Sequence, residues 1–358
     1  MKKQSVRVLV VDDSALMRKL LPQIIESDGY IQVVGTAMDG EFALKKIEEL
    51  RPDVITLDLE MPRMDGMETL RQITRRYKTP VIVVSAHTTD GAAATFRALN
   101  QGAFDFVAKP KDALSAHMDV ITRDLITKIR AAAMSRLVPQ REIKLNFDRV
   151  QKVSKVRPLA RKIIALGIST GGPNSLQYVL SQLPADFPAA ILVVQHMPEG
   201  FTELFARRLD ECCAVDVKEA QTGDLLLAGR VLISPGNKHL KVRRMPQASV
   251  AILNDDVHVN GHRPSADVLF YSAAAEFGSD AIGVLMTGMG EDGAEGLGAM
   301  RRAGSLTIAQ DEQSSVVFGM PRAAIERGYA MRVVSLDAMA NTLQVNCASE
   351  KPRAATKV

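Results

Sequence analysis

The chain has 358 residues, of which 46% are hydrophobic and 24% charged, and its net charge of +4 is too small by itself to indicate nucleic-acid binding. Its start lacks the apolar run of a signal peptide, and no segment approaches the ~18 uninterrupted apolar residues of a membrane span. Three cysteines, two of them adjacent at Cys212 and Cys213, favour free thiols in a reducing compartment. We therefore expect a cytoplasmic, two-domain protein that is not inserted into a membrane.

Short apolar runs alternate with helix-length amphipathic stretches over the first 110 residues. Each run is followed by a helical pattern, and this (βα)5 rhythm predicts a flavodoxin-like domain with one parallel sheet and helices on both faces. The expected strands are Val6–Val11, Ile31–Thr36, Val54–Leu57, Val81–Ser85 and Phe104–Ala108.

Polar side chains follow several of these expected strands. Asp12 and Asp13 come after the first strand and Asp58 after the third, so their carboxylates are expected in one crevice at the carboxyl edge of the sheet. Three carboxylates would repel one another unless a cation lay among them, and Mg²⁺, which prefers oxygen ligands, suits them. Ser85 and Lys109 end the fourth and fifth strands, where a hydroxyl and an ammonium group suit the oxygens of a phosphoryl group.

These motifs resemble the receiver domain of two-component response regulators over about residues 5–125. The resemblance is carried by Val10-Val11-Asp12-Asp13-Ser14, Asp58–Gly66, Ser85-Ala86 and Lys109-Pro110. It implies that Asp58 is phosphorylated, that the paired aspartates and Asp58 hold Mg²⁺, and that Ser85 and Lys109 contact the phosphate. Serine replaces the threonine that many receivers have at position 85, and only the hydroxyl is required.

Phe106 lies three residues before Lys109 and matches the switch aromatic of the receiver family. An aromatic residue near the end of a strand is also a common core residue. Both interpretations of Phe106 remain open.

A basic stretch separates the two halves of the chain. Residues 130–162 contain ten Lys or Arg residues and two acidic ones, beginning at the end of a helical pattern. We expect a receiver domain at residues 1–125 and a basic linker at 126–159. The linker is either a solvated connector or a segment that binds an acidic surface.

A second α/β pattern occupies residues 160–346 and is followed by a polar tail at 347–358. It predicts a doubly wound, mostly parallel α/β domain. The apolar runs are Ile163–Ile168, Ala189–Val194, Arg230–Ser234, Val250–Leu253, Ala281–Met286 and Leu306–Ala309.

A serine lies at the turn after the first of these runs, in Gly167-Ile168-Ser169-Thr170-Gly171. This segment fits the G-x-S-x-G nucleophile pattern, although a glycine-rich turn between strand and helix also forms phosphate cradles or is purely structural. A serine nucleophile needs a base, and His196 follows an expected strand at the same sheet edge. The other candidates for the base are His239, His258 and His262.

An acid that orients the base is expected after the run Ala281–Met286. Asp292 lies just past the following turn, where it is either this acid or the N-cap of the next helix. Asp255 and Asp256 compete for the role. The order Ser…His…Asp differs from the Ser…Asp…His order of the α/β-hydrolase fold, so we do not expect that fold.

The second half resembles the catalytic domain of the chemotaxis protein-glutamate methylesterases, the CheB family. The matching segments are Gly167–Asn174, Val194-Gln195-His196-Met197, Ser234-Pro235-Gly236, Asn260–Asp267 and Leu285–Gly293. The resemblance implies that Ser169 is the nucleophile, His196 the base and Asp292 its orienter. It also implies demethylation of glutamate methyl esters and deamidation of specific glutamines on chemotaxis receptors. Backbone N–H groups near Thr170 and Met289 are candidates to hold the oxyanion, and no metal is expected in this half.

Together the two resemblances imply an esterase that is controlled by a receiver, which lies over the esterase cleft when Asp58 is unmodified. The implied partners are a chemotaxis histidine kinase, as phosphodonor, and methyl-accepting chemotaxis receptors, as substrates. No nucleic-acid partner is expected. Two rival hypotheses remain: a response regulator whose output is nucleic-acid binding, supported only by the basic linker, and a degenerate esterase that acts as a phosphate-dependent docking protein.

Overall fold

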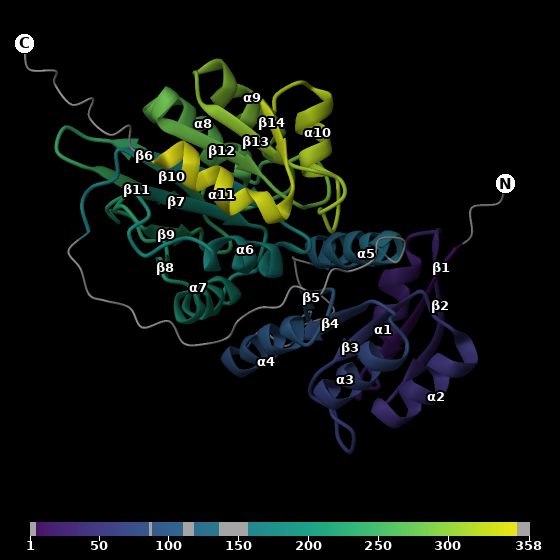
Figure 1. Ribbon diagram of the computed structural model, residues 1–358. Coiled ribbons are helices and arrows are strands. Elements are labelled where there is room, and N and C mark those ends of the chain that lie inside the picture. Colours follow the sequence, from purple (N-terminus) through teal and green to yellow (C-terminus); the bar gives the residue numbers. More distant parts are fainter. Residues whose placement is uncertain (1–4, 86–87, 110–117, 136–156, 349–358) are drawn as a thin grey trace, which may run out of the picture. The chain divides into compact units, whose positions relative to one another are not determined.

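The computed structural model describes residues 5–85, 88–109, 118–135 and 157–348. The chain divides into two compact units, residues 1–142 and 143–358, and both are α/β folds built on a parallel sheet (Figure 1). Much of the expected linker and nearly all of the expected tail lie outside the described residues. Within the described part, no helix is both long enough and apolar enough to cross a bilayer.

The first unit is a five-stranded sheet with the strand order β2-β1-β3-β4-β5, and every neighbouring pair is parallel. The expected (βα)5 fold is therefore confirmed, and each of the five expected strands differs from the observed one by at most one residue at one end. The elements are β1 Val6–Val11, α1 Met17–Glu26, β2 Ile31–Ala37, α2 Gly40–Leu50, β3 Val54–Asp58, α3 Gly66–Arg76, β4 Val81–Ser85, α4 Thr89–Asn100, β5 Asp105–Ala108 and α5 Met118–Ser135.

Helix α5 extends past residue 125, where the sequence was expected to leave the first domain. Leu125, Ile129 and Ala132 are buried, and their spacing of four and three residues continues the apolar stripe of the helix. Arg130, which counted as linker charge, forms an ion pair with Asp28. Residues 126–135 are thus part of the helix, because its buried face continues past residue 125.

The second unit contains a seven-stranded parallel sheet and a separate antiparallel hairpin, β10-β11. The sheet order is β14-β13-β12-β6-β7-β9-β8. The elements are β6 Lys162–Ile168, α6 Gly172–Ser181, β7 Ala189–Gln195, α7 Phe201–Cys212, β8 Asp216–Glu219, β9 Arg230–Ile233, β10 His239–Arg244, β11 Ser249–Asn254, α8 Ala266–Phe277, β12 Ala281–Leu285, α9 Ala294–Arg302, β13 Leu306–Gln310, α10 Met320–Glu326, β14 Arg332–Val334 and α11 Leu336–Cys347.

Strand β6 is the topological switch point of this sheet. From β6 the chain first places β7, β8 and β9 on one side, and it later places β12, β13 and β14 on the other. Crevices at such points, outside the carboxyl ends of the strands, are the usual ligand sites of open α/β sheets. The three strands that precede Ser169, His196 and Asp292 are β6 and its two direct neighbours, β7 and β12.

Candidate functional site

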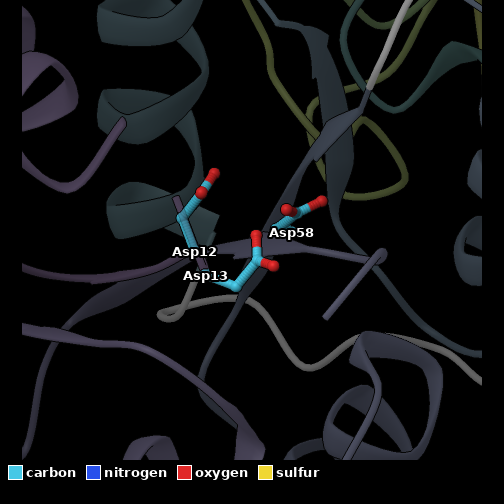
Figure 2. A group of neighbouring side chains, drawn as sticks. All are labelled: Asp12, Asp13 and Asp58. Atoms are coloured by element: carbon cyan, nitrogen blue, oxygen red, sulfur yellow. The ribbon is translucent and has the colours of Figure 1, made fainter. Parts of the chain in front are cut away.

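The first candidate site lies at the carboxyl edge of the five-stranded sheet. Asp12 follows β1 and Asp58 ends β3, and these two strands are direct neighbours. One carboxylate oxygen from each of Asp12, Asp13 and Asp58 lies within 4.8 Å of the other two. Figure 2 shows the three neighbouring side chains. Asp12 and Asp58 are buried and Asp13 is exposed. The structure therefore brings the three aspartates into one acidic cluster.

Lys109, directly after β5, reaches two carboxylates of this cluster. Its ammonium nitrogen Nζ donates to Asp58 Oδ2 at 2.6 Å and lies 3.2 Å from Asp12 Oδ2. Burial by itself would lower the pKa of Lys109, but the hydrogen bond and charge of Asp58, with the charge of Asp12, raise it above its usual value. Burial raises the pKa of Asp12, and Asp58 adds to this although Lys109 opposes it. Lys109 therefore neutralises only part of the clustered negative charge.

The donor set of the cluster fits a hard divalent cation. All three ligand groups are carboxylates, and the Oδ2 atom of Asp12 is buried without a hydrogen-bond partner in the described part of the chain. Its ion pair with Lys109 has the distance of a hydrogen bond but not the geometry. A buried carboxylate oxygen without a donor is costly unless a cation compensates it, so these residues suit Mg²⁺.

Ser85 and Phe106 lie on neighbouring strands, β4 and β5. The Ser85 hydroxyl donates to the carbonyl of Gly91 at 3.0 Å. Phe106 is buried, with its ring edge-to-face against Phe96 at 6.2 Å between centroids, and Lys128 Nζ donates to its carbonyl oxygen at 2.6 Å. Phe106 is thus a core residue in this structure, and its role as a switch stays a prediction.

The second candidate site begins at the turn between β6 and α6, where Ser169 lies. One glycine allows the turn, and another leaves room for the serine side chain. Gly171 has a left-handed backbone (φ of 72°), and a Cβ at Gly288 would come within 2.8 Å of the Cβ of Ser169. The backbone N–H of Ser169 donates to the carbonyl of Thr287 at 2.9 Å, which ties the turn to the end of β12. The serine is therefore held tightly between two strand ends.

His196, directly after β7, contacts both other members of the proposed triad. Its Nδ1 lies 3.1 Å from Ser169 Oγ, and its Nε2 lies 2.8 Å from Asp292 Oδ2. An ionised carboxylate only accepts hydrogen bonds, so the proton of the neutral imidazole belongs on Nε2. Nδ1 then presents a lone pair to the serine hydroxyl, as a general base requires.

Asp292 is buried, and its carboxylate accepts four hydrogen bonds. Oδ2 accepts from His196 Nε2 and from the backbone N–H of Ala266 at 2.7 Å, while Oδ1 accepts from Ser265 Oγ at 2.6 Å and Asn260 Nδ2 at 3.2 Å. Burial by itself would raise the pKa of Asp292, but His196, Ser265 and Ala266 hold it well below its usual range. The carboxylate is therefore ionised and fixed in orientation.

Asp292 is not the N-cap of the helix that follows it, and its carboxylate lies at the start of a different helix. Helix α9 begins after Gly293, and Asp292 makes no side-chain cap for it. The carboxylate instead accepts from Ala266, the first residue of α8, whose N-terminus favours a negative charge. Ser265, Ala266 and Asn260 were not singled out from the sequence as partners of Asp292, because their proximity depends on how α8 packs.

The other candidates for base and acid have partners elsewhere. His239 is buried, with Nε2 3.0 Å from the carbonyl of Val257 and Nδ1 accepting from the backbone N–H of Ser265. Asp255 pairs with Lys238, and Asp256 pairs with Lys241. His262 is different, because its ring stacks on that of His196. The hydrogen bonds of His196 to Ser169 and Asp292 thus favour these residues as the proposed base and acid.

The two candidate oxyanion donors adjoin Ser169. Thr170 is the next residue and is buried, and its carbonyl accepts from the hydroxyl of Thr287 at 2.9 Å. Met289 follows Gly288, whose backbone lies against the Ser169 side chain. Gln195, missed from the sequence, donates through Nε2 to the carbonyls of Ser169 at 3.0 Å and His196 at 3.2 Å. This amide links the backbones of the proposed nucleophile and base.

Comparison with known proteins places both units in known families. The CheB methylesterase family model matches residues 164–343, and the response regulator receiver domain model matches residues 8–119. A protein-glutamate methylesterase/protein-glutamine glutaminase of Koribacter versatilis is 58% identical over 98% of this chain and 99% of its own length. One of the same name from Pyrococcus horikoshii is 46% identical, covering 95% of this chain and 93% of its own.

A solved structure supports the same assignment for the second unit. The crystal structure of the Thermotoga maritima CheB methylesterase catalytic domain has 41% sequence identity and a TM-score of 0.51, and it covers 51% of this chain and 97% of its own. Sequence and fold thus agree over the second unit. The chain belongs to the CheB methylesterase family, with a response regulator receiver domain before the methylesterase domain.

Proposed function

We propose that this chain is a serine hydrolase that demethylates glutamate methyl esters on chemotaxis receptors and deamidates specific receptor glutamines, under the control of its own receiver domain. The observation that carries the proposal is the hydrogen-bonded series Ser169–His196–Asp292 at the switch point of the sheet. Relatives named protein-glutamate methylesterase/protein-glutamine glutaminase support the choice of substrate.

The reaction starts with attack of Ser169 Oγ on the γ-carbonyl carbon of the ester, while His196 Nδ1 takes the hydroxyl proton. Asp292 stabilises the imidazolium through Nε2 and keeps the ring in the tautomer that leaves Nδ1 free to accept. The tetrahedral intermediate collapses, and His196 returns the proton to methoxide, which leaves as methanol. Water then attacks the acyl-serine with His196 again as base, and this step releases the glutamate carboxylate and restores Ser169.

Deamidation uses the same steps with ammonia as the leaving group. In both reactions negative charge develops on the former carbonyl oxygen, and the backbone N–H groups of Thr170 and Met289 are the proposed donors to it. One donor of this kind is typically worth about 3 kcal/mol of transition-state stabilisation. Both proposed donors are backbone groups, so side-chain substitution would leave them in place.

The receiver is proposed to take a phosphoryl group on Asp58 from a histidine kinase. Asp12, Asp13 and Asp58 would hold Mg²⁺, which when bound neutralises charge on the incoming phosphoryl oxygens. Lys109 already donates to Asp58 Oδ2 and would turn to a phosphate oxygen after transfer. Ser85 would exchange its bond with the Gly91 carbonyl for a second phosphate oxygen.

The deciding experiment measures methanol release from methylated receptor membranes, with and without acetyl phosphate. We expect release by the wild-type chain and loss of release in Ser169→Ala, with an unchanged thermal unfolding curve. A Ser169→Ala chain within a few-fold of wild type would reject Ser169 as the nucleophile. A wild-type chain that binds receptors but releases no methanol would support the docking-protein alternative instead.

A further inference from the structure

His262 lies flat against the proposed catalytic base. The ring centroids of His196 and His262 are 3.8 Å apart, and the two planes differ by 5°. Only 9% of the His196 side chain is exposed, and His262 is itself half-buried. One face of the base is therefore covered by a second imidazole rather than by an aliphatic side chain.

The segment that carries His262 is a tight two-residue turn. Val259 and His262 exchange backbone hydrogen bonds of 3.0 and 2.9 Å, and between them Asn260 and Gly261 have φ values of 53° and 78°. Asn-Gly with both φ values positive is the preferred pair for such a turn. The following Arg263 fastens the segment, because its guanidinium donates to the carbonyls of Asp255 and Asp256 and to the side chain of Asn237.

The same turn contacts the acid of the triad as well as the base. The amide nitrogen of Asn260 donates to Asp292 Oδ1 at 3.2 Å and to Asp267 Oδ2 at 2.7 Å. Asn260 thus restrains Asp292, and His262, two residues later, covers His196. One rigid turn therefore reaches two of the three triad residues from outside the strands that carry them.

We propose that His262 is a positioning residue that fixes the tilt of the His196 ring. The hydrogen bonds to Ser169 and Asp292 hold the ring at its two nitrogens. Rotation about the Cβ–Cγ bond would turn the Nδ1 lone pair away from Ser169. A flat ring packed on one face opposes this rotation, and its π-face also favours the imidazolium that forms during the reaction.

The proposal rests on the proposed triad and is tested with His262→Ala and His262→Phe in the full-length chain. Removal of the ring should lower kcat for methanol release about tenfold, or ~1.4 kcal/mol, and leave KM within twofold. Phenylalanine keeps a flat ring and should restore kcat to within threefold of wild type. His258→Ala, which removes an exposed histidine from the same loop, is the matched control and should behave as wild type. Thermal unfolding curves compare the stability of the variants.

Several outcomes would overturn the proposal. Wild-type kcat and KM in His262→Ala would show that the stacked ring does not assist the base. A rise in KM with unchanged kcat would make His262 a substrate-binding residue, and a Phe variant as slow as the Ala variant would assign the effect to the imidazole nitrogens. Ser169→Ala, measured in parallel, distinguishes failure of the proposed triad from failure of the positioning role. Residual methanol release by Ser169→Ala would reject the triad itself. Full loss in Ser169→Ala together with normal activity in His262→Ala would reject only the positioning role.

Discussion

Replacement of Asp292 by asparagine tests the orienting role of this residue most directly. The side chain keeps its shape, but one oxygen becomes an amide nitrogen that can only donate. The more favourable orientation of the amide points its remaining oxygen towards His196 Nε2 and the Ala266 N–H. In the wild-type chain these two nitrogens lie 2.8 and 2.7 Å from Asp292 Oδ2. The amide nitrogen then faces Ser265, whose hydroxyl can rotate from donating to accepting, and Asn260, whose amide must turn.

The expected magnitude follows from which interaction is lost. With the oxygen towards His196, the tautomer is preserved and the loss is the charge-assisted part of one hydrogen bond, about 1.5–3 kcal/mol. This corresponds to a decrease in kcat of roughly 10- to 150-fold. If the nitrogen faced His196 instead, the imidazole proton would move to Nδ1, and the loss would approach ~10⁴-fold. We predict the smaller loss, because Ser265 can adapt.

The assay is the initial rate of methanol release from methylated receptor membranes, with acetyl phosphate present and KM measured alongside kcat. A loss of about a hundredfold in kcat with little change in KM supports the reasoning. A loss near 10⁴-fold would mean that the tautomer reverses and that Ser265 does not adapt. A variant within threefold of wild type would refute the orienting role of Asp292.

The same substitution has a consequence for stability. The pKa of Asp292 is lowered by folding, so its contribution to stability is present above the unfolded pKa, close to the ordinary value of 3.8, and is lost as the pH falls through the lower folded pKa. Wild type should therefore exceed Asp292→Asn in free energy of unfolding at pH 7, and the difference should shrink below about pH 4. Urea unfolding at the two pH values measures this, and a difference that is independent of pH would contradict the assignment.

Three further predictions concern the rest of the chain. Gly288→Ala should lower methanol release at least tenfold, because its Cβ would lie 2.2 Å from the Met320 sulfur and 2.8 Å from the Ser169 Cβ, and normal activity would show that this contact relaxes freely. Acetyl phosphate should label the wild-type chain only with Mg²⁺ present, and Asp58→Asn should remove the label; a persistent label would place the phosphorylation site elsewhere. A fragment that starts near Val156 should be active without a phosphodonor if the receiver covers the cleft. If only ~1% of the unmodified chains have an open cleft, the rate is lowered about a hundredfold, and phosphorylation must supply roughly 3 kcal/mol to make the open and closed states equally populated. A fragment no faster than the unmodified full-length chain would instead favour assembly of the site by phosphorylation.

The sequence by itself determined the fold class of both units and the residues worth testing. Parallel strands such as β3 and β7 are buried along their whole length, so they appear as continuous apolar runs whose ends can be located within about a residue. Once the strands are located, the residues at their carboxyl ends are expected at one edge. That is why Asp12, Asp58, Ser169 and His196 could be named before the structure was known.

Choosing among alternatives required the tertiary structure, because the deciding contacts join residues distant in the chain. Asp292 stood beside Asp255 and Asp256 as a possible acid until the packing of α8 brought Ser265 and Ala266 to its carboxylate. His262 was indistinguishable from the other histidines until a two-residue turn laid its ring on His196. The end of α5 was also missed, because Arg130 was counted as linker charge although the buried stripe of that helix continues past it. Periodicity reports which face of an element is buried, but not which partner it is buried against, and that partner sets the orientation of each functional side chain.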